Sequence, residues 1–581
     1  MPEYRYHNAA RTFPKSLSST FRRQPSERNH RADIHEQNMI KTQFLLVANQ
    51  SARLLVVAIL LIVVQRACEA DSWECPKPIL NTAENYSPEA LIKAGPFSVE
   101  STLSLNQING TAASVWIGRD LNFGFDGRGG RLFVEGRLVG KTKMLGSVGD
   151  YIRANVSFRF FARRDEKNQL EAGIGDTVLF SEGDVKGEIG EIVFRPHRNR
   201  MSILSVKITG KLVPAPASRP AVIIHRQGDD NCHTFRIPGI ARTNKGTLLG
   251  VYDLRYNSRR DLQGHMDIGL SRSTDGGKTW SIPRPIMDMG EFGGLGQDQN
   301  GCSDPNILVD TVTGEIFVSA VWTHGKPGTH QWVGRGSEPG LDIKHSSQFM
   351  VARSTDDGVT WSKPENWTAR LKNPEWYLFA PAPGNGLTLS DGTLVMPTQG
   401  RDATGLPFSN LIWSRDRGQS WTVSAPARTD TTECAVAELS DGSLMLNMRD
   451  NRNRRDKSDT NGRAVSVTPD RGRTWQVHSS DHRALPEPVC MASLISHVLP
   501  DGRRVLFFSN PNSKTGRRNM TVRASLDDGV TWPADKQILL DHRGGAYSSL
   551  VMVDQDTLGI LYESSQADLV FQKIKLSEFG L

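Results

Sequence analysis

Hydrophobic and polar residues alternate along short segments over most of the chain beyond residue 72, and this period of two is typical of β-strands. The segments SFRFFARR (157–164), TVLFSEG (177–183) and ILSVKITGKL (203–212) show it clearly. Glycine-rich stretches such as FDGRGGRLFVEGRLVG (125–140) separate such segments and favour tight turns. The pattern therefore predicts an all-β chain of short strands.

A second pattern repeats within the C-terminal part of the chain. Five segments match Ser/Thr-x-Asp-x-Gly-x-Thr/Ser-Trp, which we call the Asp-box: Ser273–Trp280, Ser354–Trp361, Ser414–Trp421, Thr468–Trp475 and Ser525–Trp532. We interpret each as a β-hairpin turn, in which Asp accepts hydrogen bonds from backbone amides and Gly supplies a positive φ. We expect Thr and Trp to begin the next strand, with the indole as an apolar plug. The motif is structural and marks where the repeats lie.

The spacing of the Asp-boxes indicates a β-propeller. Successive copies begin 54 to 81 residues apart, which suits a four-stranded blade with its loops better than a helical repeat. Five marked hairpins suggest six blades, with the last blade shared between the two ends of the region 220–581. The segments AVIIHR (221–226) and LVFQKIKL (569–576) could pair there and close the ring.

Residues 72–212 lack the Asp-box and predict an antiparallel β-sandwich of the jelly-roll kind. This region resembles concanavalin-like modules attached to secreted glycosidases. It could bind carbohydrate as a separate module or serve as a packing spacer. Residues 213–219, with the sequence Pro214-Ala215-Pro216-Ala217-Ser218, predict a stiff linker to the propeller.

The N-terminal region has the features of an export signal. Residues 54–64 (LLVVAILLIVV) are an apolar run too short for a typical membrane span and suited to a signal-peptide core. Cleavage after Ala70 would leave small residues at the expected positions, although an uncleaved anchor is an alternative. Residues 1–53 are polar and basic, so we expect a disordered or mis-annotated extension, with Met39 as an alternative start. The mature protein would be secreted, periplasmic or held at the cell surface.

Charge and cysteine content exclude several classes of protein. The net charge is +7, but residues 1–70 carry ten Lys or Arg against five Asp or Glu, so most of the excess lies in the N-terminal region. Nucleic acid is therefore not an expected partner. Five cysteines follow residue 70 at wide spacings: Cys75, Cys232, Cys302, Cys434 and Cys490. They support neither a zinc site nor a disulfide scaffold.

The first candidate for chemistry is Phe235-Arg236-Ile237-Pro238 (FRIP). Together with the five Asp-boxes, FRIP closely resembles the bacterial sialidases (exo-α-neuraminidases, glycoside hydrolase family 33) over residues 220–581. The resemblance implies a six-bladed propeller and sialylated glycans as substrates. It implies no cofactor, and no ligand cluster in the sequence argues for a structural calcium ion. We expect a monomer.

The resemblance also implies a clamp for the carboxylate of sialic acid. The family uses three arginines, which match Arg236, Arg449 and Arg517 here, with Arg518 as a neighbouring alternative to the third. Arginine suits this task because its permanently charged fork binds a carboxylate with two hydrogen bonds. In VYDLRYNSRRDLQGHMD (251–267), Arg255 matches a further arginine that helps to bind the substrate.

Asp261 matches the acid/base of the family, which protonates the leaving oxygen and later deprotonates water. Asp253 and Asp267 are its local rivals. Tyr547 in GGAYSSL matches the catalytic tyrosine, and Glu433 in TTECAVAELSDG matches its partner. A neutral phenol is not repelled by the substrate carboxylate, but it attacks poorly unless a base such as Glu433 takes its proton.

Two further acids match the family. Glu563 in LGILYE matches the residue that orients the first arginine. Asp304 in GCSDPNILVD matches an aspartate near the N-acetyl group of the substrate, although it could form a simple Asp-Pro turn.

These residues predict a retaining exo-α-sialidase. A trans-sialidase or an intramolecular trans-sialidase would share every core residue and differ in its acceptor site and in the exclusion of water. A non-catalytic propeller that binds glycans or proteins is the alternative from another class, and we would not expect it to keep the arginines, the Tyr–Glu pair and Asp261 together.

Overall fold

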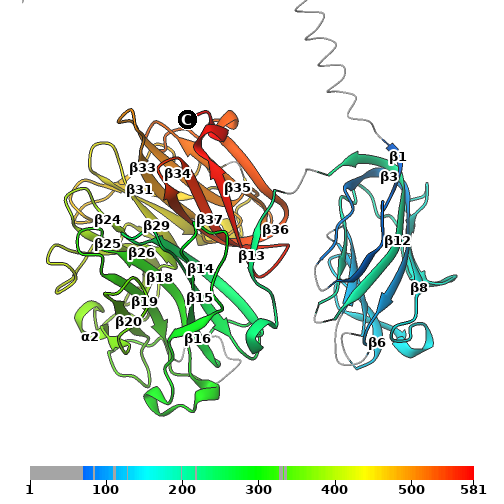
Figure 1. Ribbon diagram of the computed structural model, residues 1–581, viewed down its shortest axis with the longest axis horizontal. Helices are drawn as coiled ribbons and strands as arrows, with labels where there is room; N and C mark the ends of the chain where they lie inside the picture. The colour runs from blue at the N-terminus through cyan, green and yellow to red at the C-terminus, as the bar shows by residue number, and fades with distance from the viewer. Residues whose placement is uncertain are drawn as a thin grey trace, which may run out of the picture. The chain divides into compact units, whose positions relative to one another are not determined.

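The computed structural model describes residues 70–581 except 83–84, 109–112, 119, 127–128, 198, 216–218, 326–331, 333–335 and 459. The predicted N-terminal extension and, except for Ala70, the predicted signal segment lie outside these residues, as do residues 216–218 of the predicted linker. Within the described residues, no helix has the length and hydrophobicity needed to cross a bilayer. The chain is almost entirely β-structure, as predicted (Figure 1).

Residues 70–214 form two antiparallel sheets that enclose a common core. One sheet contains β1 (Ala70–Glu74), β2 (Ile79–Thr82), β3 (Ala90–Leu105), β8 (Phe158–Arg164), β9 (Leu170–Ile174), β10 (Thr177–Glu182) and β12 (Met201–Pro214). The other contains β4 (Ala113–Ile117), β5 (Leu121–Phe125), β6 (Arg131–Glu135), β7 (Lys143–Ser147) and β11 (Ile192–Arg195). Buried residues alternate with more exposed ones along β3, so one face of this strand supplies the core.

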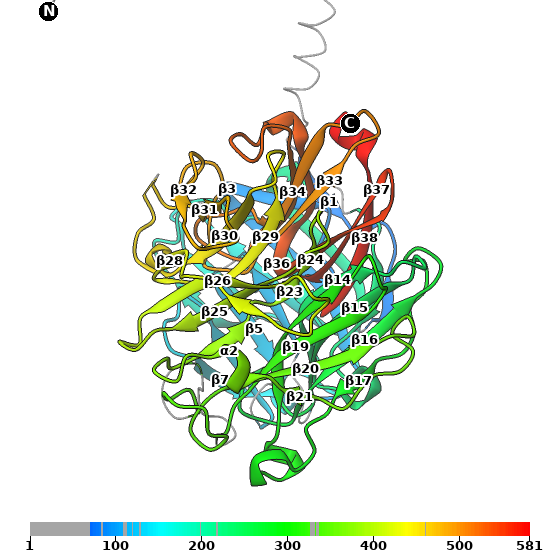
Figure 2. The same ribbon diagram turned by 90° about the vertical axis from the view of Figure 1, so that its left-hand side faces the viewer.

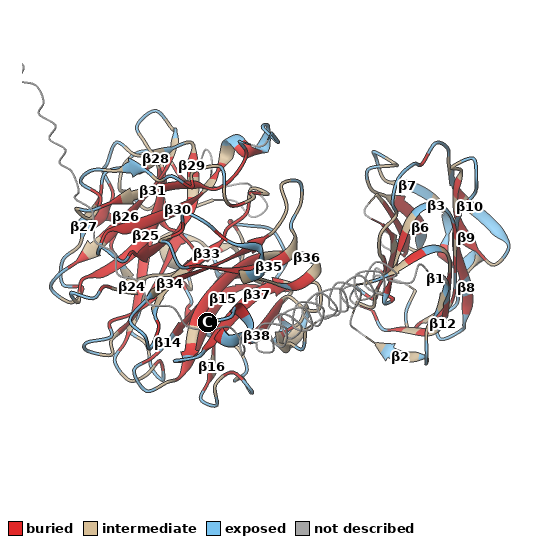
Figure 3. Cartoon of the chain, turned by 90° about the horizontal axis from the view of Figure 1, so that it is seen from above, coloured by how far each residue is buried: buried red, intermediate tan, exposed pale blue. Residues whose placement is uncertain are grey.

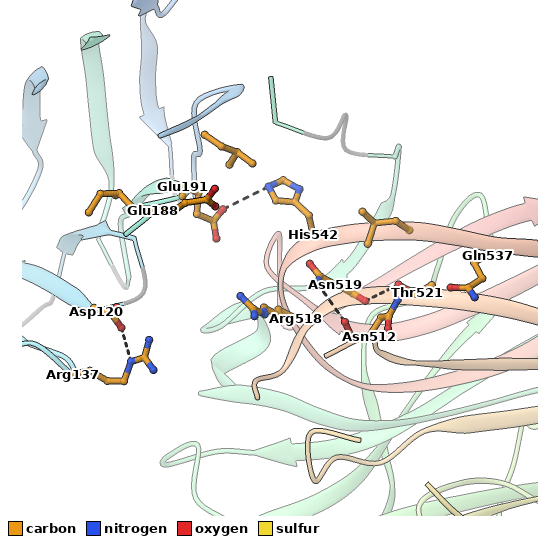
Figure 4. Close-up of a pocket in the computed structure, with 14 residues that line it drawn as sticks. Asp120, Arg137, Glu188, Glu191, Asn512, Arg518, Asn519, Thr521, Gln537 and His542 are labelled. Atoms are coloured by element: carbon orange, nitrogen blue, oxygen red, sulfur yellow. Dashed lines mark hydrogen bonds and ion pairs between the residues drawn. The ribbon is translucent and has the colours of Figure 1, made fainter. Parts of the chain in front are cut away.

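The core of the sandwich is rich in aromatic rings from both sheets. Phe123 on β5 and Phe160 on β8 are both fully buried, and their ring centroids lie 5.3 Å apart in an edge-on arrangement. At one end of the second sheet, Arg137, which follows β6, pairs with Asp120 between β4 and β5 (Figure 4). The strand β12 ends at Pro214, two residues into the predicted linker.

The remaining sheets form a six-bladed propeller, as predicted. Blade 1 contains β14 (Thr234–Arg242), β15 (Leu248–Arg255), β16 (Met266–Ser273) and β17 (Arg284–Met287). Blade 2 contains β18 (Cys302–Val309), β19 (Ile316–Trp322), β20 (Gln348–Ser354) and β21 (Glu365–Asn366), followed by the short helix α2 (Thr368–Leu371). Blade 3 contains β22 (Phe379–Pro381), β24 (Leu387–Thr388), β25 (Leu394–Arg401), β26 (Pro407–Ser414), β27 (Thr422–Val423) and β28 (Arg428–Thr429), while β23 (Gly384–Asn385) pairs with β18. Blade 4 contains β29 (Thr431–Glu438), β30 (Leu444–Asp450), β31 (Ala464–Thr468) and β32 (Gln476–Val477).

The last two blades share one long strand. Blade 5 contains β33 (Ser493–Val498), β34 (Arg504–Pro511), β35 (Arg518–Ser525) and the first half of β36 (Gln537–Asp554). Blade 6 contains the second half of β36, β37 (Thr557–Ser564), β38 (Leu569–Lys575) and β13 (Val222–His225). The pairing of β13 with β38 closes the ring and confirms the predicted pairing of these segments. In Figure 2 the blades follow one another around the ring from green through yellow and orange to red.

Propeller strands are buried on both faces because each blade packs between two others. All eight residues of β15 are buried (Figure 3), and so are all eight of β18, in contrast to the alternation along β3. Burial on both faces removes the alternation, and β18 also holds the polar residues Ser303, Asp304 and Asn306 buried among its apolar ones.

Each Asp-box joins the third and fourth strands of its blade. In the first, the Asp275 carboxylate accepts from the Thr279 backbone at 3.0 Å and from its hydroxyl at 2.6 Å, while Ser273 Oγ accepts from Gly277 N at 2.9 Å. The equivalent contacts recur in the other four boxes, and each box glycine has a positive φ, as predicted. The outer strand begins directly after Trp421 in blade 3 but only at Arg284 in blade 1, so the expectation that Trp begins this strand is wrong in detail.

Candidate active site

The innermost strands of four blades carry candidate residues where their pairing is irregular. Neighbouring inner strands contact one another, as β14 does with β18 and with β36. The pairing skips between Arg236 and Gly239 in β14, between Ser303 and Asn306 in β18, between Thr431 and Cys434 in β29 and between Gly545 and Ser548 in β36. Such bulges turn side chains away from the regular sheet direction. These four bulges therefore present Arg236, Asp304, Glu433 and Tyr547.

Arg236 is held by a forked ion pair with Glu563. Arg236 Nε donates to Glu563 Oε1 at 3.1 Å, and Nη2 donates to Oε2 at 3.2 Å. The same carboxylate accepts from the backbone of Ile237 at 2.9 Å, where φ is +60°. A positive φ is costly for a β-branched residue, so this contact helps to hold the local bend. Glu563 thus fixes both the side chain of Arg236 and its backbone.

Tyr547, Glu433 and Arg449 form a closed hydrogen-bonded cluster. The Tyr547 hydroxyl donates to Glu433 Oε1, and Arg449 Nη1 donates to Glu433 Oε2 at 2.5 Å and to the Tyr547 hydroxyl at 2.9 Å. Only 6% of Tyr547 is exposed. The buried carboxylate is therefore paired with a positive charge and also contacts the proton of the phenol.

Burial raises the pKa of Tyr547 well above its usual value of 10, and the negative charge of Glu433 adds to the rise, while Arg449 and Arg517 oppose it. The phenol is therefore protonated at neutral pH. Two arginines lie over the ring of Tyr547. The guanidinium carbon of Arg236 is 5.5 Å from the ring centroid, and that of Arg517 is 5.4 Å from it. The third arginine of the predicted clamp thus lies beside the tyrosine.

Arg517 rather than its neighbour Arg518 lies at the cluster. Arg517 is exposed, and its Nη2 donates to the carbonyl of Val489 at 3.1 Å. Arg518 instead directs Nε to Ser513 Oγ at 3.4 Å and pairs with Gly544 at the start of β35. Figure 4 shows Arg518 near Asn512 and Asn519. The geometry favours Arg517 as the residue that meets a ligand at Tyr547.

Asp261 is the most exposed of the three aspartates weighed as acid/base, with 44% of its side chain accessible. Its Oδ1 accepts from Arg255 Nη1 at 2.8 Å and lies 3.7 Å from Arg236 Nη1. Asp253 is fully buried, and Asp267 accepts from the Tyr256 hydroxyl at 2.9 Å. Only Asp261 therefore combines access to solvent with proximity to the arginine clamp.

Arg255 lies beneath Asp261 and has an exposed side-chain fraction of only 1%. Nε and Nη2 both donate to Asp253 Oδ2, at 3.1 and 2.8 Å, and Nη1 also donates to the carbonyl of Arg259 at 2.9 Å. Every nitrogen of this guanidinium is thus engaged with the protein. Here the structure places Arg255 as a support for the Asp261 loop, whereas direct substrate binding by Arg255 stays a prediction.

Asp304 lies on β18, with φ of +60° and only 5% exposed. Its carboxylate accepts from Ser303 Oγ at 3.2 Å and from Gln399 Nε2 at 3.4 Å. Burial raises the pKa of Asp304 well above its usual value, and the carboxylates of Glu433 and Asp253 raise it further. A protonated Asp304 can donate a hydrogen bond to a polar ligand group.

Sequence reasoning did not single out Ser303, Gln399 or the carbonyl of Val489. Ser303 and Asp304 both contact Asp253, with Ser303 Oγ donating to Asp253 Oδ2 at 2.8 Å and Asp304 N to Oδ1 at 3.1 Å. Gln399 lies on β25, 95 residues after Asp304, and no local motif marks it. A backbone carbonyl has no sequence signal at all, so only the fold could reveal Val489.

The described residues show no group of three or more His, Cys, Asp or Glu side chains arranged to hold a metal ion. The five cysteines after residue 70 are all free thiols, four of them buried. The side chains that meet at the site bring together a phenol, carboxylates and guanidinium groups. This set suits acid–base and nucleophilic reactions on an anionic ligand.

Comparisons with known proteins agree with this site. Residues 255–560 match the BNR repeat-like domain family. A sialidase of Bacteroides fragilis is 53% identical over 364 residues, which cover 62% of this chain and 65% of that protein. A sialidase of Micromonospora viridifaciens is 33% identical over 355 residues, covering 58% of this chain and 50% of that protein. The matched segment thus spans less than two thirds of either relative.

A solved structure extends the similarity. The Hadza microbial sialidase has a TM-score of 0.59 and is 35% identical, with coverage of 86% of this chain and 95% of that chain. The match reaches beyond the propeller into the N-terminal strands. The chain therefore belongs to the sialidase family.

Proposed function

We propose that this chain is a retaining exo-α-sialidase, which hydrolyses terminal α-linked sialic acids from glycoproteins, glycolipids and oligosaccharides. One observation carries the proposal: the Tyr547 hydroxyl donates to Glu433 while Arg449 donates to both groups. Family membership supports the same reaction.

The anionic substrate explains the choice of groups. Sialic acid carries a carboxylate on its anomeric carbon, and Arg236, Arg449 and Arg517 all surround the Tyr547 ring or hydroxyl. Three fixed guanidinium groups would bind that carboxylate and orient the anomeric carbon toward the phenol. A carboxylate nucleophile at the same place would be repelled by the substrate, whereas a protonated phenol is not.

The first half of the reaction forms a bond between the Tyr547 oxygen and the anomeric carbon. The bond from the anomeric carbon to the leaving oxygen breaks, and Asp261 donates its proton to that oxygen. Glu433 accepts the phenolic proton as Tyr547 attacks, so no free phenolate is needed. The product is a covalent sialyl-tyrosine with an inverted anomeric centre.

The second half reverses these steps with water. Asp261, now ionised, takes a proton from water as the water oxygen attacks the anomeric carbon. The Tyr547 oxygen leaves and recovers its proton from Glu433. Two inversions give net retention, and Asp261 ends protonated, as it began.

The test uses release of 4-methylumbelliferone from its α-sialoside by the wild type and by the Tyr547→Phe variant. Because this variant keeps the ring but loses the nucleophile, we expect kcat/KM to fall at least about 100-fold. Tyr562→Phe is the matched control, since it removes another buried hydroxyl, which accepts from Gln572 at 2.8 Å. Equal activity of wild type and Tyr547→Phe would refute the assigned nucleophile.

Product analysis by NMR tests the stereochemistry and the fate of the sugar. We expect free sialic acid that is released first as the α-anomer and then mutarotates. An anhydro sugar as the main product would indicate an intramolecular trans-sialidase instead. Transfer of sialic acid to added lactose as the main outcome would indicate a trans-sialidase.

A further inference from the structure

A buried ion pair lies behind the carboxylate clamp and contacts none of the reacting groups. Arg463 Nη1 pairs with Glu487 Oε2, and both side chains are 0% exposed. Arg463 also donates from Nη1 to the carbonyl of Cys490 at 2.7 Å, and Glu487 Oε1 accepts from the backbone of Cys490 at 2.8 Å. Both polar groups of the Cys490 backbone are therefore fixed by this pair.

The segment 487–490 carries the contact that orients Arg517. Val489, just before Cys490, has φ of +60°, which is unusual and costly for a β-branched residue. Its carbonyl accepts from Arg517 Nη2 at 3.1 Å, and the Arg517 guanidinium carbon lies 5.4 Å from the centroid of the Tyr547 ring. The bent backbone thus directs a carbonyl at an otherwise exposed arginine.

The same ion pair reaches the strand of the second clamp arginine. Arg463 Nε donates to Asn447 Oδ1 at 2.7 Å, and Asn447 lies two residues before Arg449 on β30. Residues two apart on a strand point to the same face. Arg463 therefore connects the strand that carries Arg449 to the segment that holds Arg517.

Fold stability alone gives no reason for this arrangement. A fully buried ion pair loses hydration at both charges, and well-packed apolar residues in its place are often equally or more stable. A rigid connection between two ligand-binding side chains, by contrast, keeps their geometry ready for the ligand and lowers the entropy cost of binding.

We propose that Arg463 and Glu487 are positioning residues, which set the Val489 carbonyl and so hold Arg517 in line with Arg449 for the carboxylate of the substrate. This inference rests on the proposed function, because it assigns the clamp to a sialoside. The pair acts through other residues and does not touch the substrate.

The test replaces the whole pair with apolar residues of similar size, Arg463→Met together with Glu487→Leu, so that no buried charge is left unpaired. A clamp that binds substrate and transition state alike affects KM, so we expect KM for the umbelliferyl sialoside to rise about tenfold and kcat to change less than about twofold. The Kd for free sialic acid, measured by calorimetry, should rise by the same factor.

The control is Arg353→Met together with Glu315→Leu, which removes a partly exposed ion pair in the same way. These residues form an ion pair of 2.8 Å at the Asp-box end of blade 2. This variant should leave KM unchanged. Thermal unfolding of all the proteins shows whether each variant is folded.

A folded pair variant with wild-type KM and Kd overturns the inference and leaves the proposed function intact. A wild type that binds free sialic acid but hydrolyses no sialoside refutes the proposed function, while the Kd comparison still decides the inference. A wild type that neither binds nor hydrolyses refutes both. If the double variant does not fold, Arg463→Lys serves instead, because the ammonium keeps a positive charge opposite Glu487 but lacks the Nε–H that Arg463 donates to Asn447. KM and Kd should then rise by a smaller factor, and unchanged values overturn the inference.

Discussion

Tyr547 is surrounded by groups that control its proton. Burial keeps the phenol protonated at neutral pH, Glu433 contacts that proton, and Arg449 bonds to both groups. Arg236 and Arg517 lie over the ring of the same tyrosine. In the proposed reaction, this proton would pass to Glu433 as the phenol attacks.

The substrate dependence of an Asp261 variant tests its role as acid. Asp261→Asn cannot protonate a leaving oxygen, so the loss depends on how basic that oxygen is. We expect kcat/KM for sialyl-lactose to fall about 10²- to 10³-fold, and that for the umbelliferyl sialoside to fall less than about tenfold. Initial rates on both substrates provide the measurement, and equal losses on the two would contradict this role.

At the scale of elements, the Asp-boxes and the site lie at opposite ends of the strands. In blade 1, Leu248 of β15 pairs with Ser273 at the first Asp-box, while Arg255 is at the other end of β15. In blade 2, Asp304 lies near the start of β18 and Ser354 at the end of β20. The boxes shape the turns on one side, and the bulges shape the site on the other.

Ser354→Ala tests this separation of roles. Ser354 is 3% exposed, and its Oγ accepts from Gly358 N at 3.0 Å and donates to Asp356 at 2.9 Å. Loss of these bonds leaves a buried N–H without a partner, so the free energy of unfolding should fall by about 1–3 kcal/mol. kcat/KM at a temperature where both proteins are folded should not change, and denaturant titration with kinetics checks both statements.

The closing strand contains a buried histidine whose titration couples stability to pH. His225 Nε2 lies 2.7 Å from the Tyr252 hydroxyl and 3.0 Å from Ser271 Oγ, and its ring stacks on Phe235 at 4.4 Å between centroids. Burial lowers the pKa of His225 from 6.5 to about 4. The folded state therefore binds fewer protons than the unfolded state between these pH values.

The stability that His225 contributes is fully present above pH 6.5 and is lost as the pH falls toward 4. A pKa shift of this size corresponds to a change of about 3 kcal/mol in the free energy of unfolding. His225→Gln should flatten the fall of the unfolding free energy over this range, as measured by denaturant titration at several pH values. Parallel pH profiles for the two proteins would show that another group is responsible.

At the scale of the molecule, closure of the propeller decides which strand edges are covered. β13 lies far from β38 in the sequence but pairs with it, and Arg219 just before β13 forms a forked ion pair with Glu578 at 2.7 and 3.1 Å. Without β13, the edge of β38 would be open to association with other chains. The sheets of residues 70–214 share no strand with the propeller sheets.

Two truncations test this closure. The chain from residue 219 keeps Arg219 and β13, so we expect it to fold and to hydrolyse the umbelliferyl sialoside with kcat/KM close to that of the full chain. The chain from residue 228 lacks β13 and should lose at least about 3 kcal/mol of stability and aggregate on heating. Thermal unfolding and light scattering distinguish them, and equal stability of the two truncated chains would count against the closure.

Much of the fold follows from short-range patterns. Each Asp-box encodes its own turn, because the Asp, Gly and hydroxyl residues that make its hydrogen bonds lie within eight positions of one another. Five such turns, which begin 54 to 81 residues apart, predict the blades, and the apolar segments 221–226 and 569–576 indicate how the ring closes. The resemblance carried by FRIP named residues that lie together in the structure, including Arg236 and Glu563, which are 327 positions apart.

Only the tertiary structure decided what supports those residues. It bonded every guanidinium nitrogen of Arg255 to the protein beneath Asp261, and it turned the carbonyl of Val489 toward Arg517. It also brought Arg463 and Glu487 together behind the clamp, and Gln399 beside Asp304. These contacts depend on how whole blades pack and on where a bulge bends the backbone. The sequence by itself therefore determined the repeats and the chemical groups, because those depend on local hydrogen bonds and side-chain chemistry, whereas the positions of the groups depend on packing between distant strands.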